Sequence, residues 1–258
     1  HMPQETVLIT GASSGIGLEL AKRFAADKCN LILVARSQDK LDSLAAAMRQ
    51  EHGIQVLVLA KDLANPAAPQ EIFDQLTAQG IIVDVVVNNA GFGSVGTVAE
   101  LPIDRQLDMV QVNVVALMLL ARLFLPGMIQ RGRGGVLNVG STAGFQPGPG
   151  MAVYYATKAF VLSFTEALAE ELAGTGVGAT CLAPGPTETG FGADSGMGET
   201  LIFKLGMMDA ATVARIGYRA YRRRKPLVIS GWTNRIGAFL VRLAPRALVR
   251  KVVIRLQK

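Results

Sequence analysis

The stretch TVLITGASSGIG, residues 6–17, decides the fold class of this chain. Its apolar run up to Thr10 predicts a buried β-strand, and the apolar positions that follow from Gly15 to Asp27 recur with the period of a helix. The glycines between them permit a tight turn and a close approach of the backbone to a ligand. The N-terminus of the helix adds N–H donors and a positive dipole, which favour a phosphate. This segment therefore predicts a nucleotide-binding unit.

Strands and helices alternate along the rest of the chain. Short apolar runs predict strands at 6–10, 31–35, 54–59, 83–87, 136–139, 178–182 and 226–229. A 3.6-residue apolar period predicts helices at 15–27, 38–50, 69–78, 103–131 and 152–172, and a loop-rich insertion precedes the last strand. Such alternation is typical of a parallel sheet covered on both faces. We expect an α/β fold, a doubly wound parallel seven-stranded sheet with helices on both faces and extra C-terminal helices.

The composition narrows the class of protein. The 258 residues are 50% hydrophobic and 18% charged, which suits one domain with a large core and excludes a disordered chain. Cys29 and Cys181 form no CxxC pattern, so we expect free thiols and a cytoplasmic location. We interpret His1–Met2 as a cloning remnant, and no signal peptide is visible. With His52 as the one further histidine, a Ser-His-Asp triad is disfavoured and no metal is expected.

The positive charge is concentrated towards the C-terminus. Residues 215–258 contain 13 Lys and Arg and no Asp or Glu, whereas residues 1–214 contain 13 Lys and Arg and 20 Asp and Glu. We predict a domain at 3–230 and a basic amphipathic helical tail at 231–258. Packing of the tail on the domain or a partner subunit is favoured, and a peripheral membrane contact is the alternative. Nucleic acid is disfavoured because no recognised binding module accompanies the charge.

The second predicted strand ends in Val34-Ala35-Arg36-Ser37, about twenty residues after the glycine-rich turn. A site for NAD places a carboxylate here to bind the ribose 2′-hydroxyl, whereas an arginine accommodates a 2′-phosphate. No acidic residue occurs between Asp27 and Asp39. Arg36 therefore predicts NADP(H) as the cofactor.

Polar side chains gather at the ends of further predicted strands. Asn88 and Asn89 follow the fourth strand, Ser141 follows the fifth, and Tyr154 and Lys158 lie one turn apart on the next helix. Ligands of open α/β sheets bind at the carboxyl ends of the strands. A nearby lysine cation lowers the pKa of a tyrosine from its reference value of about 10 towards working range. We predict Tyr154 as the general acid/base and Ser141 as the group that holds the substrate oxygen.

Taken together, these motifs resemble those of the short-chain dehydrogenase/reductase family. The matches are TGASSGIG at 10–17, Asp62-Leu63, NNAG at 88–91, Asn113, Ser141, YYATK at 154–158 and PGPTET at 184–189. They cover the chain from residue 6 to about 190 in the order of that family. The resemblance implies a Rossmann fold and an NADP(H)-dependent oxidoreductase that interconverts a carbonyl and a secondary alcohol.

The resemblance also implies roles for the matching residues. Tyr154 is the general acid/base, Lys158 binds the nicotinamide ribose and lowers the tyrosine pKa, Ser141 positions the substrate oxygen, and Asn113 holds a water of the proton relay. Arg36 lies at the phosphates, and the segment 184–189 engages the carboxamide. The expected cofactor-binding residues are Gly11, Ser13, Ser14, Gly15, Ile16, Gly17, Arg36, Asp62, Leu63, Asn89, Ala90, Gly91, Tyr154, Lys158, Pro184, Gly185, Thr187 and Thr189.

The substrate and the assembly are less constrained. Residues 191–208 are rich in Gly, Met and Phe, and we expect them to form a substrate loop over a small to medium lipophilic alcohol or ketone. A loop that packs on its own hydrophobic residues is an equal alternative. The resemblance implies a homodimer through the helices at 103–131 and 152–172. One alternative is a non-enzymatic NADPH-binding module that reaches a membrane or a partner through its tail. Another, a sugar-nucleotide epimerase or dehydratase, is disfavoured by the short C-terminal portion and the glycine spacing.

Overall fold

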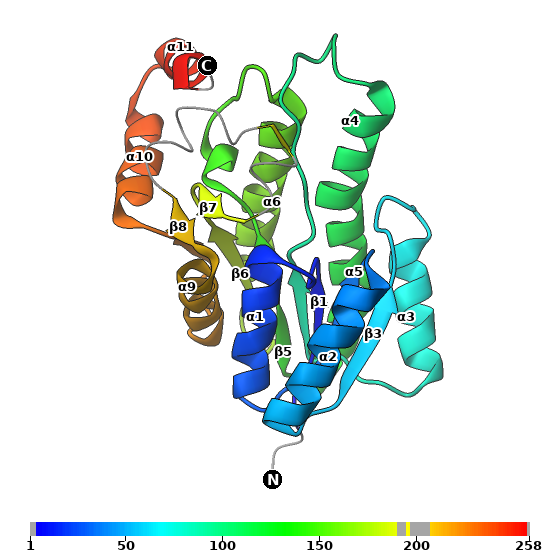
Figure 1. Cartoon of the computed structure of the whole chain (residues 1–258). Helices are drawn as coiled ribbons and strands as arrows, with labels where there is room; N and C mark the ends of the chain where they lie inside the picture. The colour runs from blue at the N-terminus through cyan, green and yellow to red at the C-terminus, as the bar shows by residue number, and fades with distance from the viewer. Residues whose placement is uncertain (1–3, 190–194, 197–206, 257–258) are drawn as a thin grey trace.

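A parallel sheet of seven strands forms the centre of the computed structural model, which describes residues 4–189, 195–196 and 207–256 (Figure 1). The strand order is β3-β2-β1-β4-β5-β6-β9, and all neighbours are parallel. Between β1 and β4 the order of connection reverses, and a doubly wound sheet binds ligands at that point. The predicted Rossmann-fold sheet is confirmed.

The elements agree with the prediction, with ends shifted by up to two residues. The strands of the sheet are β1 (Thr6–Thr10), β2 (Asn30–Ala35), β3 (Val56–Ala60), β4 (Val85–Asn88), β5 (Gly134–Val139), β6 (Val177–Ala183) and β9 (Leu227–Ile229). The helices are α1 (Gly15–Ala26), α2 (Gln38–His52), α3 (Ala68–Ala78), α4 (Ile103–Val110), α5 (Leu117–Arg131), α6 (Ala152–Glu171), α9 (Ala210–Arg222), α10 (Trp232–Leu243) and α11 (Arg246–Leu256). Two shorter helical segments are the π-helical η1 (Gln111–Ala116) and the 3₁₀-helical η2 (Thr142–Phe145), and β7 (Thr187–Glu188) pairs with β8 (Met208–Asp209).

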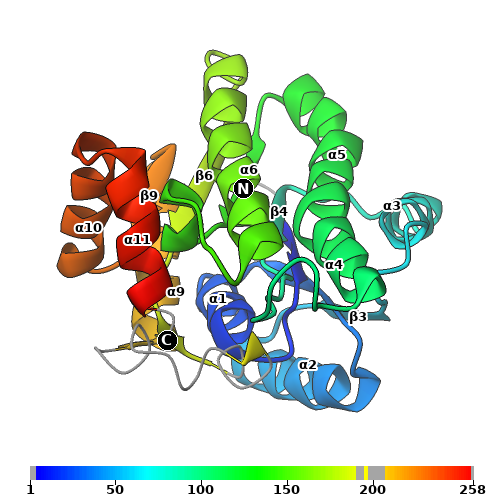
Figure 2. The same cartoon turned by 90° about the horizontal axis from the view of Figure 1, so that it is seen from above.

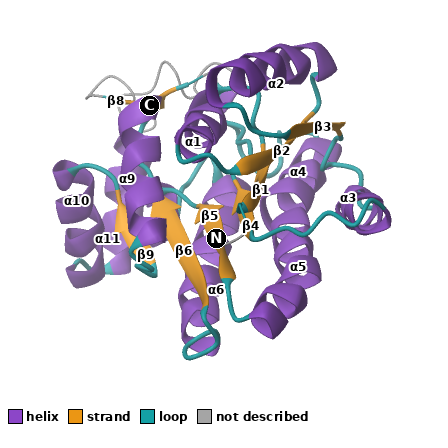
Figure 3. Cartoon of the chain, turned by 90° about the horizontal axis from the view of Figure 1, so that it is seen from below, coloured by secondary structure: helices purple, strands orange, loops and turns teal. Residues whose placement is uncertain are grey.

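The core lies in two layers, one on each face of the sheet. Alternate strand residues point to opposite faces, so Val7 and Ile9 of β1 pack with helices α1, α2 and α9, whereas Leu8 packs with α3, α5 and α6. Figures 2 and 3 show these two groups of helices on opposite sides of the strands. Burial on both faces explains why the strands are apolar at nearly every position.

Helix α9 occupies part of the segment for which a loop-rich insertion is expected, so that expectation is wrong for residues 210–222. The helix begins at Asp209, whose carboxylate accepts a hydrogen bond of 2.7 Å from the Thr212 N–H. The helix is amphipathic, but its buried face consists largely of small residues between arginines, so the segment is polar on average. Packing on α1, where Phe24 meets the Tyr218 ring edge-on, stabilises it.

The long helical run from 103 to 131 has a mean hydropathy of 2.0 in its most apolar window, so by length and composition it could cross a membrane. Half of that window is buried, and Leu120 and Phe124 belong to the core beneath the sheet. The run is interrupted by η1, whose wider turn accommodates Asn113. We interpret it as a core helix.

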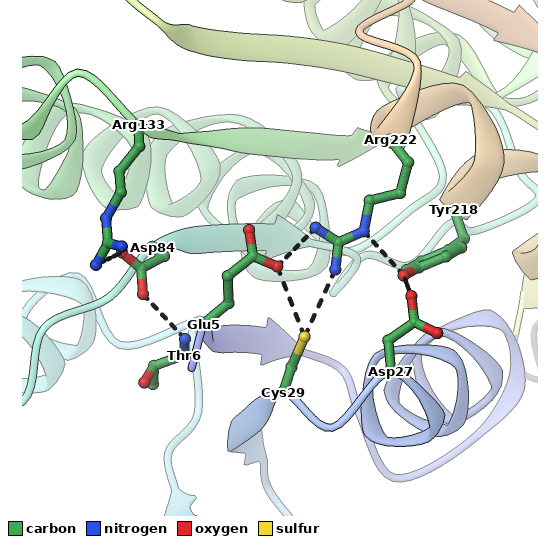
Figure 4. Close-up of polar contacts among 8 residues, drawn as sticks. All are labelled: Glu5, Thr6, Asp27, Cys29, Asp84, Arg133, Tyr218 and Arg222. Carbon is green, nitrogen blue, oxygen red and sulfur yellow. Dashed lines mark hydrogen bonds and ion pairs between the residues drawn. The ribbon is translucent and has the colours of Figure 1, made fainter. Parts of the chain in front are cut away.

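A polar network joins α9 to the amino edge of the sheet (Figure 4). Arg222 pairs with Glu5 at 2.6 Å and donates from Nε to the Tyr218 hydroxyl at 2.8 Å. That hydroxyl donates in turn to Asp27, and the buried thiol of Cys29 lies against both members of the Arg222–Glu5 pair. Beside the carboxylate, burial raises the pKa of the Cys29 thiol to about 11. This network ties a helix near the C-terminus to the first strand.

The C-terminal tail forms the two predicted helices, α10 and α11, beyond β9 (Figure 2). Val249 and Val253 of α11 are buried in an apolar cluster that contains Met109, Met151, Tyr154 and Tyr155. This part of the tail therefore packs on the domain, beside the residues for which catalysis is predicted.

Candidate active site

A groove of about 710 Å³ opens at the carboxyl edge of the sheet. Residues from β2, β5 and α6 and from the loops that follow β1 and β4, far apart in sequence, line it together. The predicted residues among its lining are Gly11, Ser13, Ser14, Gly15, Ile16, Arg36, Asp62, Leu63, Asn89, Ala90, Gly91, Ser141, Tyr154, Lys158, Pro184, Gly185, Thr187 and Thr189. Of the predicted site residues, Gly17 and Asn113 lie outside the lining.

The glycine-rich turn has the geometry of a phosphate cradle. Gly11 and Gly15 have φ angles of +64° and +54°, in the left-handed region that favours glycine. At Gly17, a Cβ atom would lie 2.3 Å from the Gly11 carbonyl oxygen, so this glycine permits the close packing of turn on helix. Ser14 caps α1 without a side-chain hydrogen bond, and the first turn of α1 contains no acidic residue. The helix N-terminus thus presents its N–H groups and positive dipole to the groove.

Asn89 stabilises this turn from the neighbouring strand. Its amide nitrogen donates to the carbonyl oxygens of Thr10 and Gly11, at 3.0 and 3.1 Å. The Thr10 hydroxyl accepts hydrogen bonds from the backbone N–H groups of Asn89 and Ala90. Asn89 therefore shapes the cradle, and its predicted contact with a cofactor stays a prediction.

The end of β2 brings basic side chains to the groove. Arg36 lines it as predicted, and Lys40 and Lys61 line it as well, although the sequence analysis missed both. Lys61 forms an ion pair of 2.6 Å with Glu71, so part of its charge is already compensated. Next to Lys61, the Asp62 carboxylate accepts a hydrogen bond from the Ala64 N–H, which orders the loop after β3. The environment of Arg36 is compatible with an anionic group.

Tyr154 and Ser141 meet at another part of the groove. Ser141 caps η2, and its hydroxyl accepts a hydrogen bond of 3.1 Å from the Ala143 N–H. Burial raises the pKa of Tyr154 above its ordinary value, and a hydrogen bond with the Ser141 side chain opposes this shift. At neutral pH Tyr154 therefore carries its proton.

Lys158 follows Tyr154 by one turn of α6 and is 6% exposed. Its Nζ donates to the Val139 carbonyl oxygen at 2.9 Å and lies 5.9 Å from the centre of the Tyr154 ring. Burial lowers the pKa of Lys158 to about 8. Burial of the phenol is the largest influence on the Tyr154 pKa and raises it, so the net lowering expected from Lys158 is not found in this structure.

Asn113 is buried, and its side chain is held by several hydrogen bonds. Its amide nitrogen donates to the Phe92 carbonyl oxygen at 2.9 Å and to the Thr157 hydroxyl at 3.0 Å, and its amide oxygen accepts from the Phe92 N–H at 3.1 Å. The Thr157 hydroxyl also donates to the Tyr154 carbonyl oxygen at 2.7 Å. Asn113 therefore joins the loop after β4 to the turn of α6 that carries Tyr154, and its predicted part in a proton relay stays a prediction.

Other groove residues were not predicted. Tyr155 lines the groove beside Tyr154, where its ring packs against Gly148 so closely that a Cβ there would lie 2.2 Å away. Arg105 donates to the Ser94 hydroxyl at 2.8 Å and lies over the Phe92 ring. Gln146 lies in the segment after η2. Tyr155 stands in the YYATK motif, but its three-residue interval to Lys158 made it the less favoured tyrosine. No motif surrounds Arg105 or Gln146, so the tertiary structure alone identifies these two.

The comparisons with known proteins agree with this geometry. Residues 5–200 match the family model described as short chain dehydrogenase. The chain belongs to the short-chain dehydrogenase/reductase family. It is 41% identical over 180 residues to a very-long-chain 3-oxoacyl-CoA reductase of Pyrenophora tritici-repentis, covering 68% of this chain and 52% of the relative. It is 38% identical to the NADP-dependent 3-hydroxy acid dehydrogenase YdfG of Salmonella typhi, covering 69% of this chain and 71% of the relative.

Among solved structures, the short-chain dehydrogenase of Sphingobium yanoikuyae in complex with NADPH matches with a TM-score of 0.83 at 33% identity, covering 95% of each chain. The chain spans about half the length of the fungal 3-oxoacyl-CoA reductase. The family is one of oxidoreductases that act on alcohol- and ketone-type substrates.

The groove of this short-chain dehydrogenase fits a dinucleotide. A cradle with free N–H groups, a basic residue at the end of β2 and the Tyr154–Ser141 pair lie along one continuous surface. The segment from Pro184 to Thr189 closes the groove near α1, where the Thr189 side chain approaches Gly15. Most of the predicted substrate loop 191–208 lies outside the described residues.

Proposed function

We propose that this protein is an NADP(H)-dependent oxidoreductase that reduces a ketone to a secondary alcohol, with Tyr154 as the proton donor. The observation that carries the proposal is the buried Tyr154, hydrogen-bonded to Ser141 at the groove that also contains the phosphate cradle and Arg36. The names of the similar proteins, one an NADP-dependent dehydrogenase and one in complex with NADPH, support the choice of cofactor.

The side chains suit proton donation to a carbonyl oxygen. Tyr154 is protonated at neutral pH, which is the form that a general acid needs. Ser141 orients the same oxygen, and Lys158 supplies a positive charge that favours the phenolate left after transfer. Because the pKa of Lys158 is about 8, the Lys158 side chain is mostly protonated at pH 7 and carries this charge.

The proposed cofactor sites follow the groove. The cradle from Gly11 to Ile16 would hold the pyrophosphate, Arg36 the 2′-phosphate, and Lys158 the ribose next to Tyr154. The nicotinamide of the bound cofactor supplies the hydride.

The surroundings of Tyr154 favour a lipophilic substrate of small to medium size. Phe92, Val112, Val139 and Ala143 line the groove together with Tyr154. Apolar side chains suit the hydrocarbon groups of such a substrate. Two curated relatives act, by name, on 3-oxoacyl or 3-hydroxy acid compounds, so such compounds belong in the substrate tests.

Turnover is tested by the oxidation of NADPH in the presence of ketones of increasing chain length and of 3-oxoacyl thioesters. We expect turnover to rise with substrate hydrophobicity. Binding of NADPH without turnover of any carbonyl would contradict the proposal and favour a non-enzymatic module.

Cofactor choice is tested by calorimetric titration of NADPH and NADH against wild type and Arg36→Ala. We expect the variant to bind NADPH about 10- to 100-fold more weakly, since an arginine–phosphate contact contributes about 1.5 to 3 kcal/mol. NADH binding should stay unchanged. Arg23→Ala removes an exposed arginine from α1 as a control. Equal loss for both cofactors in Arg36→Ala would contradict recognition of the 2′-phosphate.

A further inference from the structure

Helix α10 turns its apolar side away from the protein. Trp232, Phe239, Leu240 and Leu243 are 74, 61, 56 and 69% exposed. The side that faces the domain contributes the buried Ala238 and a partly buried Val241. In a helix stabilised by packing on its own domain, the large apolar residues face inward. The large apolar side chains on the outward face of α10 are therefore not packed against the domain, and exposed apolar surface of this kind marks an interaction site.

A second groove continues this face towards the sheet. It has a volume of about 540 Å³ and lies between α10 and the edge strand β9. Its floor is apolar, with Phe145, Leu227 and Ile229, and Arg235 and Arg242 of α10 also line it. We call this surface, with the exposed side chains named above, the α10 face.

The charge around the α10 face selects among possible occupants. Residues 231–258 contain seven Lys and Arg and no Asp or Glu, and the lining of the second groove contains no acidic side chain. A symmetric dimer would place this face on its own copy and bring Arg235 and Arg242 of both copies together without carboxylates. A binding partner with an apolar interior and a negatively charged surface complements both the apolar side chains and the arginines of the α10 face. A bilayer with anionic lipids has both properties.

We propose that the α10 face docks the protein on membrane surfaces that contain anionic lipids. Trp232, Phe239 and Leu243 enter the boundary between headgroups and acyl chains, where tryptophan is favoured. Arg235 and Arg242 contact the lipid phosphates. The helix lies in the plane of the surface and does not cross the bilayer.

The position of α11 connects the docked face to the active site. Val241 and Ala244, at the end of α10, pack with Val249 and Val253 of α11, and this cluster reaches Tyr154 and Tyr155. Docking through α10 would hold the groove close to the lipid, where lipophilic compounds concentrate. The docking itself is independent of the proposed reaction, because it is measured without cofactor or substrate.

Trp232 provides a direct measurement, since it is the single tryptophan of the chain. The full-length protein is mixed with vesicles of phosphatidylcholine alone or with added phosphatidylserine, and Trp232 emission and co-sedimentation are recorded. We expect a blue shift of the emission and sedimentation with the anionic vesicles, weakened by salt. Absence of binding to either vesicle, or equal binding to both, would overturn the proposal.

Matched variants assign the binding to the α10 face. Phe239→Ser with Leu243→Ser, and separately Arg235→Gln with Arg242→Gln, should each lower vesicle affinity at least tenfold. Two control variants change exposed residues elsewhere on the protein. The apolar control is Ile82→Ser with Ile129→Ser, and the basic control is Arg219→Gln with Arg223→Gln. Each should leave the vesicle affinity within about twofold of wild type. Equal losses in the control variants would overturn the assignment. A different result would assign the α10 face to a second copy of the chain. In that case wild type forms a dimer and does not bind vesicles, and the variant with Phe239→Ser and Leu243→Ser is monomeric.

Discussion

Arg222 at the amino edge of the sheet and Lys158 at the carboxyl edge differ in how their positive charges are accommodated. At the amino edge, Glu5 and Arg222 lie 2.6 Å apart, and Asp84 lies 3.3 Å from Arg133 (Figure 4). At the carboxyl edge, Lys158 is buried against a backbone carbonyl and forms no ion pair within the described part of the chain. Arg222 and Glu5 therefore compensate each other's charge at the amino edge, whereas burial at the carboxyl edge shifts the pKa values of Lys158 and Tyr154.

The largest effect that this comparison predicts is on turnover. Tyr154→Phe removes the proton donor of the carboxyl edge and should lower kcat by about 10²- to 10⁴-fold, the usual contribution of general acid catalysis. NADPH affinity should change little, because the ring is retained. Tyr155→Phe is the matched control, with kcat within about threefold of wild type. Activity of Tyr154→Phe above about a tenth of wild type would contradict the role.

The next effect is a pH dependence of stability that comes from Lys158. Its pKa is about 8 in the folded protein and about 10.4 in an unfolded chain, so between these values the unfolded state binds more protons. The contribution of Lys158 is unfavourable below pH 8, and it diminishes as the pH rises to about 10.4.

Denaturant unfolding of wild type and Lys158→Met from pH 7 to 10.4 isolates this term from those of other groups. The difference in unfolding free energy, wild type minus variant, should rise by about 2 to 3 kcal/mol over this range. A difference that stays constant with pH would mean that the lysine pKa is not lowered.

The smallest effect concerns the amino edge. Arg222→Gln breaks a half-buried network and should lower the free energy of unfolding by about 1 to 2 kcal/mol, with kcat unchanged. Lys22→Gln, at the exposed Lys22–Glu19 pair, is the control and should change stability by less than about 0.5 kcal/mol. A loss of kcat in Arg222→Gln with unchanged stability would contradict the prediction that the amino-edge network contributes to stability and not to turnover.

Much of the site could be predicted because its signals are local. Gly11 and Gly15 indicate positions with a left-handed backbone. The four-residue interval between Tyr154 and Lys158 places both side chains on one face of a helix. Lys40 and Lys61 could not be predicted in this way, because only their positions in space bring them to the groove.

Asn89 and Asn113 show a different limit. Both stand in recognisable motifs, yet their amides are bound to the turn after β1 and to the loop after β4. A motif preserves the type of side chain, but its partners depend on which segments the fold brings together. Helix α9 was missed because its buried residues are mostly small and the segment is polar on average, so its stability depends on packing against α1.

By itself, the sequence determined the order of the seven strands of the main sheet and of the helices up to α6, the phosphate cradle and the types of side chain at the carboxyl edge. These depend on side-chain periodicity, glycine and short spacings, which involve neighbours along the chain. The tertiary structure alone decided the raised pKa of Tyr154, the lowered pKa of Lys158 and the outward direction of the apolar side of α10. Burial decides each of these, and burial depends on residues that are distant in the sequence.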